Sequence, residues 1–293
     1  HQSDDALCIG HLRFGEASFM LGAFADARAS LKRSLEVGEQ LESCSALSAL
    51  LPHNPRTHGL NYLAWALFAL GYLDQAMALC SQAIAEARML SDPFVLADAM
   101  ENSCSVYILC RNPKAVGETA DGLVALVTET KGFSGNLGLA AFARGWVIAE
   151  EGQPGEAIEP MYQGISYYRA TGSDAEVPHQ LCVLAEVHCK AGQPAAALRL
   201  LDEASTLMAR TGERWCEAEL HRRRGIALLA LPNPTNGGAE ACFERALTIA
   251  REQNARAWQL RAARDLGRLW SNQGKLAEAR ELREAKALLD ALA

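Results

Sequence analysis

The sequence has few aromatic residues and almost no runs of β-branched residues, which argues against sheet-rich fold classes. Aromatic side chains make up 6% of the 293 residues, whereas 49% of the residues are hydrophobic. Alanine and leucine are in surplus, and they suit helix-on-helix packing better than a β-sandwich or a β-barrel. The composition therefore predicts an all-α protein with enough apolar surface for an extensive core.

The sequence also lacks an excess of positive charge. Its 28 Lys and Arg residues stand against 35 Asp and Glu residues, for a net charge of −7. A general nucleic-acid surface normally needs a basic balance or a clear basic face, so we expect no direct nucleic-acid partner. The nine cysteines are scattered rather than grouped as a disulfide framework, which indicates a reducing, cytoplasmic compartment.

No secretory signal and no convincing membrane span is present. The first residues contain no basic region followed by an apolar core, and the chain begins at His1, so we expect a piece of a longer protein. The 17 uncharged residues between Arg56 and Asp74 are at the lower limit of membrane-spanning length. They include His58 and Asn61, and they occupy the place of more polar helices in other repeats. We therefore expect no membrane partner.

Catalytic motifs are missing as well. A phosphate-binding loop needs Gly, four residues, Gly-Lys and then Ser or Thr. The dipeptide Gly274-Lys275 has Leu269 and Leu276 in the other required places, so it indicates a turn. There is no HExxH and no CxxC. We expect no catalytic residue and no cofactor in this region.

The strongest positive signal is an internal repeat. Residues 59–87 predict two helices around the turn at Gly71, and the second helix has a ridge of small residues at Ala76, Cys80 and Ala83. Alanines equivalent to Ala76 recur at intervals of 49, 39, 42, 40, 42 and 40 residues, as Ala27, Ala76, Ala115, Ala157, Ala197, Ala239 and Ala279. Five of them follow a glycine by five residues, namely after Gly22, Gly71, Gly152, Gly192 and Gly274.

A helix pair of about 40 residues exposes an apolar face that only a neighbouring pair can cover, so the pairs must stack as an α-solenoid. We expect a single solenoid of about seven helix pairs, right-handed and tetratricopeptide-like. The repeats lie near residues 7–43, 59–90, 93–131, 136–170, 176–210, 213–253 and 256–293. Residues 44–58 and 231–238 are the two stretches most expected to be irregular.

Particular strings carry a family resemblance. HNPRTHGLNYLAWALFALGYLDQAM and TGERWCEAELHRRRG, with the repeat pattern, resemble the C-terminal tetratricopeptide arm, of maltose-regulator type, in bacterial signal-transduction ATPases. In that family the arm usually follows an ATPase module and a class III adenylyl/guanylyl cyclase or a winged-helix DNA-binding domain. Relatives place an aromatic-rich segment after the equivalents of Glu281 and Leu282. Here that segment was lost, or the chain is not contiguous between Leu282 and Arg283.

The first helix of each pair lines the concave surface of such a solenoid, and the repeat register places aromatic and polar residues there. The candidate peptide- or ligand-binding residues are Asn61, Trp65, Tyr107, Phe142, Trp146, His179 and Glu186. The simpler interpretation is that the aromatic ones fill the narrow inner side of a tight superhelix.

Two further patterns lie on first helices. His179, Cys182, Glu186 and Cys189 share one helical face and have metal-ligand chemistry, although close packing explains them more simply. Structural zinc sites usually take ligands from several elements, so we expect no metal there. Arg261, Arg264 and Arg268 predict a solvated face, with an acidic partner as the alternative.

Two functions remain open. The first is a non-catalytic arm that senses a ligand or partner and signals to an ATPase, cyclase or transcriptional regulator in the parent chain. The second is a free-standing scaffold that binds a peptide segment in its groove. Either would bind a protein or peptide segment, or a small-molecule effector, and the first would also contact other domains of the parent.

Overall fold

The computed structural model describes residues 2–39, 53–130, 134–170, 172, 174–234 and 236–279, and within these ranges it contains helices and no strand. Residues 276–279 begin one more helical segment after the thirteenth helix. The thirteen helices are α1 (Gln2–Met20), α2 (Phe24–Gly38), α3 (Pro55–Ala69), α4 (Leu73–Met89), α5 (Pro93–Leu109), α6 (Pro113–Thr130), α7 (Ser134–Glu150), α8 (Pro154–Ala170), α9 (Val177–Lys190), α10 (Pro194–Thr211), α11 (Glu217–Leu229), α12 (Asn236–Glu252) and α13 (Arg256–Asn272).

Several helices begin where a short polar residue precedes a proline. Asn54 caps α3, because its side-chain oxygen accepts hydrogen bonds from the backbone N–H groups of Arg56 and Thr57, both at 3.1 Å. Asp92 caps α5 in the same way. The proline that follows each cap loses no hydrogen bond, since the first helical turn has unpaired donors anyway. The sequence thus fixes where these helices begin.

The turn within most helix pairs has a residue with a left-handed backbone. Gly22, Gly71, Gly152, Gly192 and Gly274 all have positive φ, between 73° and 96°. Glycine adopts this conformation without a steric penalty from Cβ. In the third repeat Arg111 takes the left-handed conformation instead, with φ 57°. The five turn glycines predicted from the sequence are confirmed.

Small residues make the contact between the two helices of a pair. Ala76, Cys80 and Ala83 on α4 are completely buried, and so are Ala157, Ala197 and Ala239 in later repeats. Side chains of this size let the helix axes approach closely. Backbones also approach closely between α7 and α8, where Gly164 faces the carbonyl oxygen of Gly138. The predicted register of the second helices is right in these repeats, whereas in the third repeat Ala115 is only half-buried and the neighbouring Val116 is fully buried.

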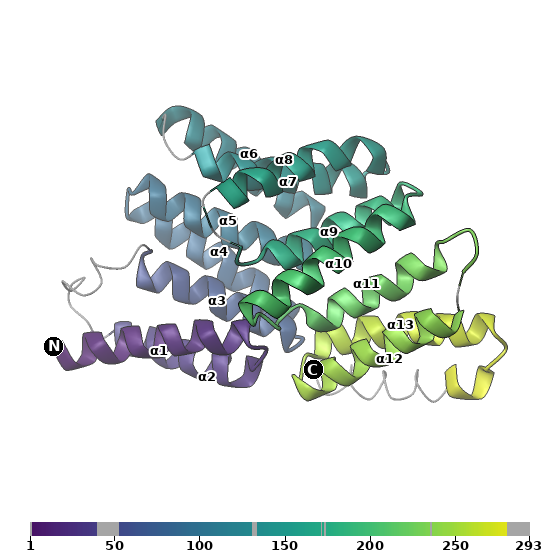
Figure 1. Ribbon diagram of the computed structural model, residues 1–293. Helices are drawn as coiled ribbons and strands as arrows, with labels where there is room; N and C mark the ends of the chain where they lie inside the picture. The colour runs from purple at the N-terminus through teal and green to yellow at the C-terminus, as the bar shows by residue number, and fades with distance from the viewer. Residues whose placement is uncertain are drawn as a thin grey trace.

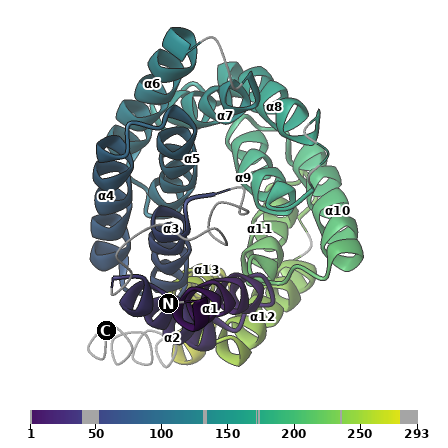
Figure 2. The same cartoon turned by 90° about the vertical axis from the view of Figure 1, so that its left-hand side faces the viewer.

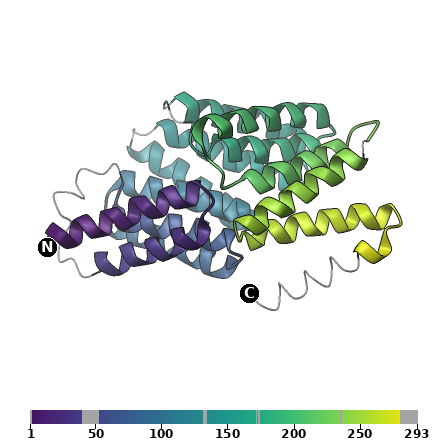
Figure 3. The same cartoon turned by 60° about the horizontal axis from the view of Figure 1, so that its bottom comes forward.

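The pairs stack into a superhelix whose ends meet (Figure 1). The odd-numbered helices form the inner layer, and the even-numbered helices α4, α6, α8 and α10 form the outer one (Figure 2). The first pair lies next to the last helices, as Figure 3 shows from below. At this junction the backbone N–H of Arg214 donates to the carbonyl oxygen of Met20, at 2.7 Å. The solenoid closes on itself.

The structure corrects two boundaries. Residues 55–58, expected to be irregular, are the first turn of α3, because Asn54 and Pro55 initiate a helix there. Residues 236–238, expected within a loop, already belong to α12. The sequence departure near Glu281 and Leu282 lies outside the described residues. None of the described helices combines the length and the apolar character needed to cross a bilayer.

Candidate functional site

The inner side of the superhelix contains an aromatic cluster of Phe19, Trp65, His179 and Trp215. The ring centroids of Trp65 and Trp215 are 4.8 Å apart, and those of Phe19 and Trp215 are 5.2 Å apart. The ring centroid of His179 lies 4.8 Å from that of Trp215. The four rings come from α1, α3, α9 and the turn before α11, so this cluster joins the first two repeats to the fifth and sixth. Aromatic pairs at such distances are mutually attractive beyond their area burial.

A second contact between distant repeats is centred on Arg261 of α13. Its guanidinium lies over the rings of Phe68 and Trp258, 5.4 Å and 5.1 Å from their centroids. The two rings are themselves 5.0 Å apart. Arg261 also donates a hydrogen bond to the backbone carbonyl of Leu109, at the end of α5. A cation over an aromatic face is stabilising, so this contact ties α13 to α3 and α5.

Beside these rings lies a charge network made of Arg111, Glu186, Glu219, Arg222, Arg223 and Asp265. Glu219 accepts two hydrogen bonds from Arg222, at 2.7 and 2.6 Å, and one from Arg223, at 2.8 Å. Glu186 accepts from Arg111 at 2.6 Å and also from Arg223. Arg222 reaches Asp265 on α13. The network connects the third repeat with the fifth, sixth and seventh.

The network influences the charge states of its member Glu219 and of the neighbouring His179. Burial by itself would raise the pKa of Glu219, but Arg222 and Arg223 outweigh it and hold that pKa well below its ordinary value. His179 has no such carboxylate partner. Burial first, and then the positive charge of Arg223, lowers the pKa of His179 to about 3. The carboxylate is therefore ionised, and the imidazole neutral, at physiological pH.

All seven candidate residues lie on α3, α5, α7 and α9, the helices expected to line the concave side. The structure packs them against neighbouring elements, and six are buried: Asn61, Trp65, Tyr107, Phe142, Trp146 and His179. Glu186 is partly accessible but is engaged by three basic residues. Their contact with a partner stays a prediction, and it requires the inner face to become accessible.

The other two patterns do not assemble as sites. The ligand atoms of His179, Cys182, Glu186 and Cys189 do not converge; among the described residues, three metal-ligating side chains come together only at His53, His58 and Asp98. The arginines were expected to form one solvated face, and this is wrong for Arg261. Arg264 and Arg268 are exposed, but Arg261 faces the interior, because closure of the superhelix brings Phe68 and Leu109 to it.

Sequence reasoning did not predict the roles of Phe19, Trp215 and Trp258. Nothing in the spacing of a repeat tells which residues meet when the superhelix completes a turn. Trp215 does lie within TGERW, one of the strings that carry the family resemblance. That string was the available signal.

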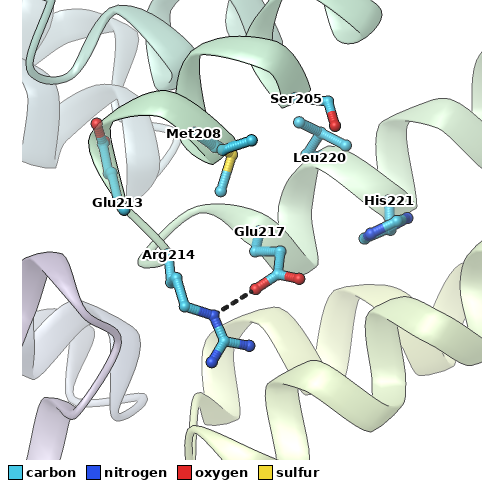
Figure 4. A pocket seen from close by; sticks show the side chains of 9 residues that line it. Ser205, Met208, Glu213, Arg214, Glu217, Leu220 and His221 are labelled. Carbon is cyan, nitrogen blue, oxygen red and sulfur yellow. Dashed lines mark hydrogen bonds and ion pairs between the residues drawn. The ribbon is translucent and has the colours of Figure 1, made fainter.

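An accessible pocket opens between α10 and α11, beside the turn that precedes α11 and carries Trp215 (Figure 4). It has a volume of about 350 Å³, and Met208, Leu220, Glu213, Glu217 and His221 are among its lining residues. Two of its lining residues are paired, because Arg214 donates to Glu217 at 2.9 Å. Burial raises the pKa of Glu213 to about 7. The pocket therefore offers carboxylates beside a small apolar wall.

Comparisons with known proteins place this geometry among repeat proteins. No protein-family model matches the chain. A curated, uncharacterized protein of Rhizobium meliloti (strain 1021) is 24% identical over 251 residues, covering 86% of this chain and 24% of that protein. The chain thus spans about a quarter of that relative's length.

Two solved structures share the fold. A Rap protein complexed with Competence and Sporulation Factor has a TM-score of 0.67 and 13% identity, over 97% of this chain and 77% of that one. A signal transduction ATPase with numerous domains and a tetratricopeptide repeat sensor, from Pyrococcus horikoshii, has a TM-score of 0.51 and 12% identity, over 99% of this chain and 45% of that one. The predicted tetratricopeptide-like solenoid is confirmed.

Proposed function

We propose that this chain is a non-catalytic sensor arm of a larger bacterial signalling protein, an ATPase, a nucleotide cyclase or a transcriptional regulator. The arm binds a protein or peptide segment on its inner face, and a small effector is the alternative occupant. One observation carries the proposal: the inner face holds buried hydrogen-bonding groups without a partner among the described residues, at Trp65 Nε1, Asn61 Nδ2, His179 Nε2 and Trp258 Nε1. Groups of this kind are rare in a finished core and call for an explanation.

The comparisons support this role without deciding it. One structural neighbour is a signal transduction ATPase with a tetratricopeptide repeat sensor, and another was solved in complex with Competence and Sporulation Factor. The Rhizobium meliloti relative is about four times as long as the matched region, which leaves room for output domains in a parent chain.

The closed superhelix also supplies a means of signalling. A partner that inserts between Trp65 and Trp215 must separate the second repeat from the sixth. Binding and opening are then linked, because a ligand shifts the equilibrium only by its preference for one of the two states. The arm would report occupancy to the rest of the parent as a change in the separation of its ends.

The test begins with a partner captured on the purified chain from host lysate and identified by mass spectrometry. Its dissociation constant is then measured for wild type, Trp65→Phe and Trp270→Phe. Trp65→Phe removes the free indole N–H and keeps an aromatic ring, and it should weaken binding about tenfold. Trp270 is the matched control, because its indole N–H already donates to Glu240 at 2.7 Å. Equal affinities in folded variants would contradict the proposal.

The runner-up is a free-standing scaffold. It is favoured by the Rap structure, in which the shared fold makes up 77% of the chain rather than one arm among several. The two functions predict different coding sequences upstream of His1. An ATPase or cyclase module there supports the sensor arm, and a start codon nearby supports the scaffold.

A further inference from the structure

We propose that His53, His58 and Asp98 form a binding site for a divalent transition-metal ion of the zinc class, with Glu16 orienting His58. The three residues come from the start of α3 and from α5, and their ligand atoms all lie within 4.8 Å of one another. The site is separate from the aromatic cluster and from the predicted stripe on α9.

The distances between the donor atoms suit a single metal ion bound by all three residues. His53 Nδ1 is 3.2 Å from Asp98 Oδ1, and His58 Nδ1 is 3.5 Å from Asp98 Oδ2. Ligand atoms around a tetrahedral zinc ion at about 2.0 Å are separated by little more than 3 Å, so these spacings need little contraction. His58 and Asp98 are buried, whereas about a third of the His53 side chain is exposed, at 31%, which provides an entry path.

The polar atoms at this site make ion-pair contacts of 3.2 to 3.5 Å with one another rather than well-directed hydrogen bonds. His53 Nδ1, His58 Nδ1, Asp98 Oδ2 and Glu16 Oε1 are all buried and have no well-aligned hydrogen bond in the structure. Four buried polar atoms at one place without a hydrogen bond of good geometry are uncommon in a protein interior. A bound cation satisfies both imidazole nitrogens and the carboxylate at once.

Surrounding groups hold the ligands as metal sites usually require. Glu16 Oε1 lies 3.2 Å from His58 Nε2, so Glu16 can accept the proton on that nitrogen while Nδ1 faces the ion. Carboxylate–imidazole–metal arrangements fix the tautomer and increase the basicity of the ligand. Asn102 Nδ2 donates to Asp98 Oδ1 at 3.2 Å, and the ring of Tyr62 packs 4.8 Å from His58.

One rearrangement accompanies binding. The two imidazole rings are stacked, 4.3 Å apart and 6° from parallel, so their in-plane lone pairs do not yet converge on one point. His53 precedes α3 and is the more exposed of the two. Its ring can turn about χ2, a torsion with a broad energy profile, to bring Nδ1 toward the ion.

The donor set determines the class of ion. Two imidazoles and one carboxylate suit zinc, cobalt or nickel, whereas calcium and magnesium prefer oxygen ligands throughout. Three protein ligands leave a fourth position for water or for a side chain of a partner. Cysteine takes no part, and this distinguishes the site from any adventitious site at the chain's thiols.

The test is a cobalt(II) titration of the metal-free chain, followed by visible and near-ultraviolet absorption. Wild type should bind one equivalent, with the visible bands of a nitrogen- and oxygen-ligated ion and without thiolate charge-transfer absorption. Glu16→Gln should weaken binding about 10–100-fold. His53→Gln and Asp98→Asn should weaken it further, since each removes a ligand. His221→Gln, a partly buried histidine elsewhere, is the matched control and should bind like wild type.

Zinc should also raise the melting temperature of wild type and of His221→Gln, but not of His53→Gln, because a ligand that binds only the folded state stabilises it. Circular dichroism establishes that each variant is folded. No saturable cobalt binding, equal binding by folded His53→Gln, or a thiolate spectrum would each overturn the proposal. The cluster would then be an ion pair of His58 with Asp98 and Glu16 and nothing more.

Discussion

Glu219 is the carboxylate on which the interior charge network depends, and we expect Glu219→Gln to destabilise the protein strongly. The side chain is fully buried and accepts three hydrogen bonds from Arg222 and Arg223, between 2.6 and 2.8 Å. Arg261 Nη1 lies 3.8 Å from it as well. Glutamine has the same shape, but it is neutral and has a single acceptor oxygen. The substitution leaves Arg222 with Asp265, and Arg223 with Glu186, as the remaining carboxylate partners, so the buried positive charge is only partly compensated, at a cost of about 3–5 kcal/mol.

The assay is urea unfolding at pH 7, followed by circular dichroism. The control is Glu118→Gln on α6, because Glu118 is exposed and its ion pair with Lys114 spans 3.9 Å. Exposed pairs of this kind contribute about 0–1 kcal/mol. A loss below about 1 kcal/mol for Glu219→Gln would refute the reasoning, since it would mean that water or rearrangement compensates the arginines.

The pH dependence provides a second check on Glu219. Its folded-state pKa lies below the ordinary value of 4.5, so its ionised form is favoured by folding. The stabilisation is therefore complete above about pH 4.5 and declines as the pH falls toward the folded-state pKa. The difference between wild type and Glu219→Gln should be constant from pH 7 to 5 and shrink below 4.5.

Three further substitutions probe the packing and the charge of single positions. Ala197→Leu should cost about 1–3 kcal/mol by overpacking, whereas Ala195→Leu on the exposed side of α10 should be neutral in thermal melts. Gly164→Ala should cost more, because its Cβ would lie 2.5 Å from the Gly138 carbonyl oxygen, and it should lower the melting temperature most. Burial raises the pKa of Glu213 from 4.5 to about 7, so wild type loses stability as the pH rises through this range. Glu213→Gln should then be about 3 kcal/mol more stable in urea at pH 8, and near wild type at pH 4.

The sequence was enough to predict the local structure of the repeats. Ala76 and Gly71 lie where their spacing placed them, because the contact within a helix pair and its turn depend on residues close together in the chain. Closure of the superhelix is different. The contact of Trp65 with Trp215 depends on small rotations between successive repeats, which add up over the stack and leave no spacing in the sequence.

The candidate site shows the same division. Helical register correctly put Trp65 and His179 on inner helices, but it did not tell an open groove from a filled interior. Burial of both follows from closure, and so does the reassignment of Arg261 from a solvated face to a cation over Phe68 and Trp258. Arg261 has one partner on its own helix, Trp258, but its contacts with Phe68 and Leu109 come from distant repeats.

Two separate features, His58 and Trp65, lie on one helix. His58 and Trp65 are seven residues apart on α3, about two turns, so both project from the same side of this inner-layer helix. His58 lies against Glu16 of α1 and Asp98 of α5, while Trp65 contacts Trp215 from the sixth repeat. A ligand that draws α1, α3 and α5 together at His58 therefore acts on the helix that contacts the sixth repeat. If the inner face opens to admit a partner, α3 is the element that couples metal binding at His58 to separation of Trp65 from Trp215. By thermodynamic linkage this coupling is reciprocal.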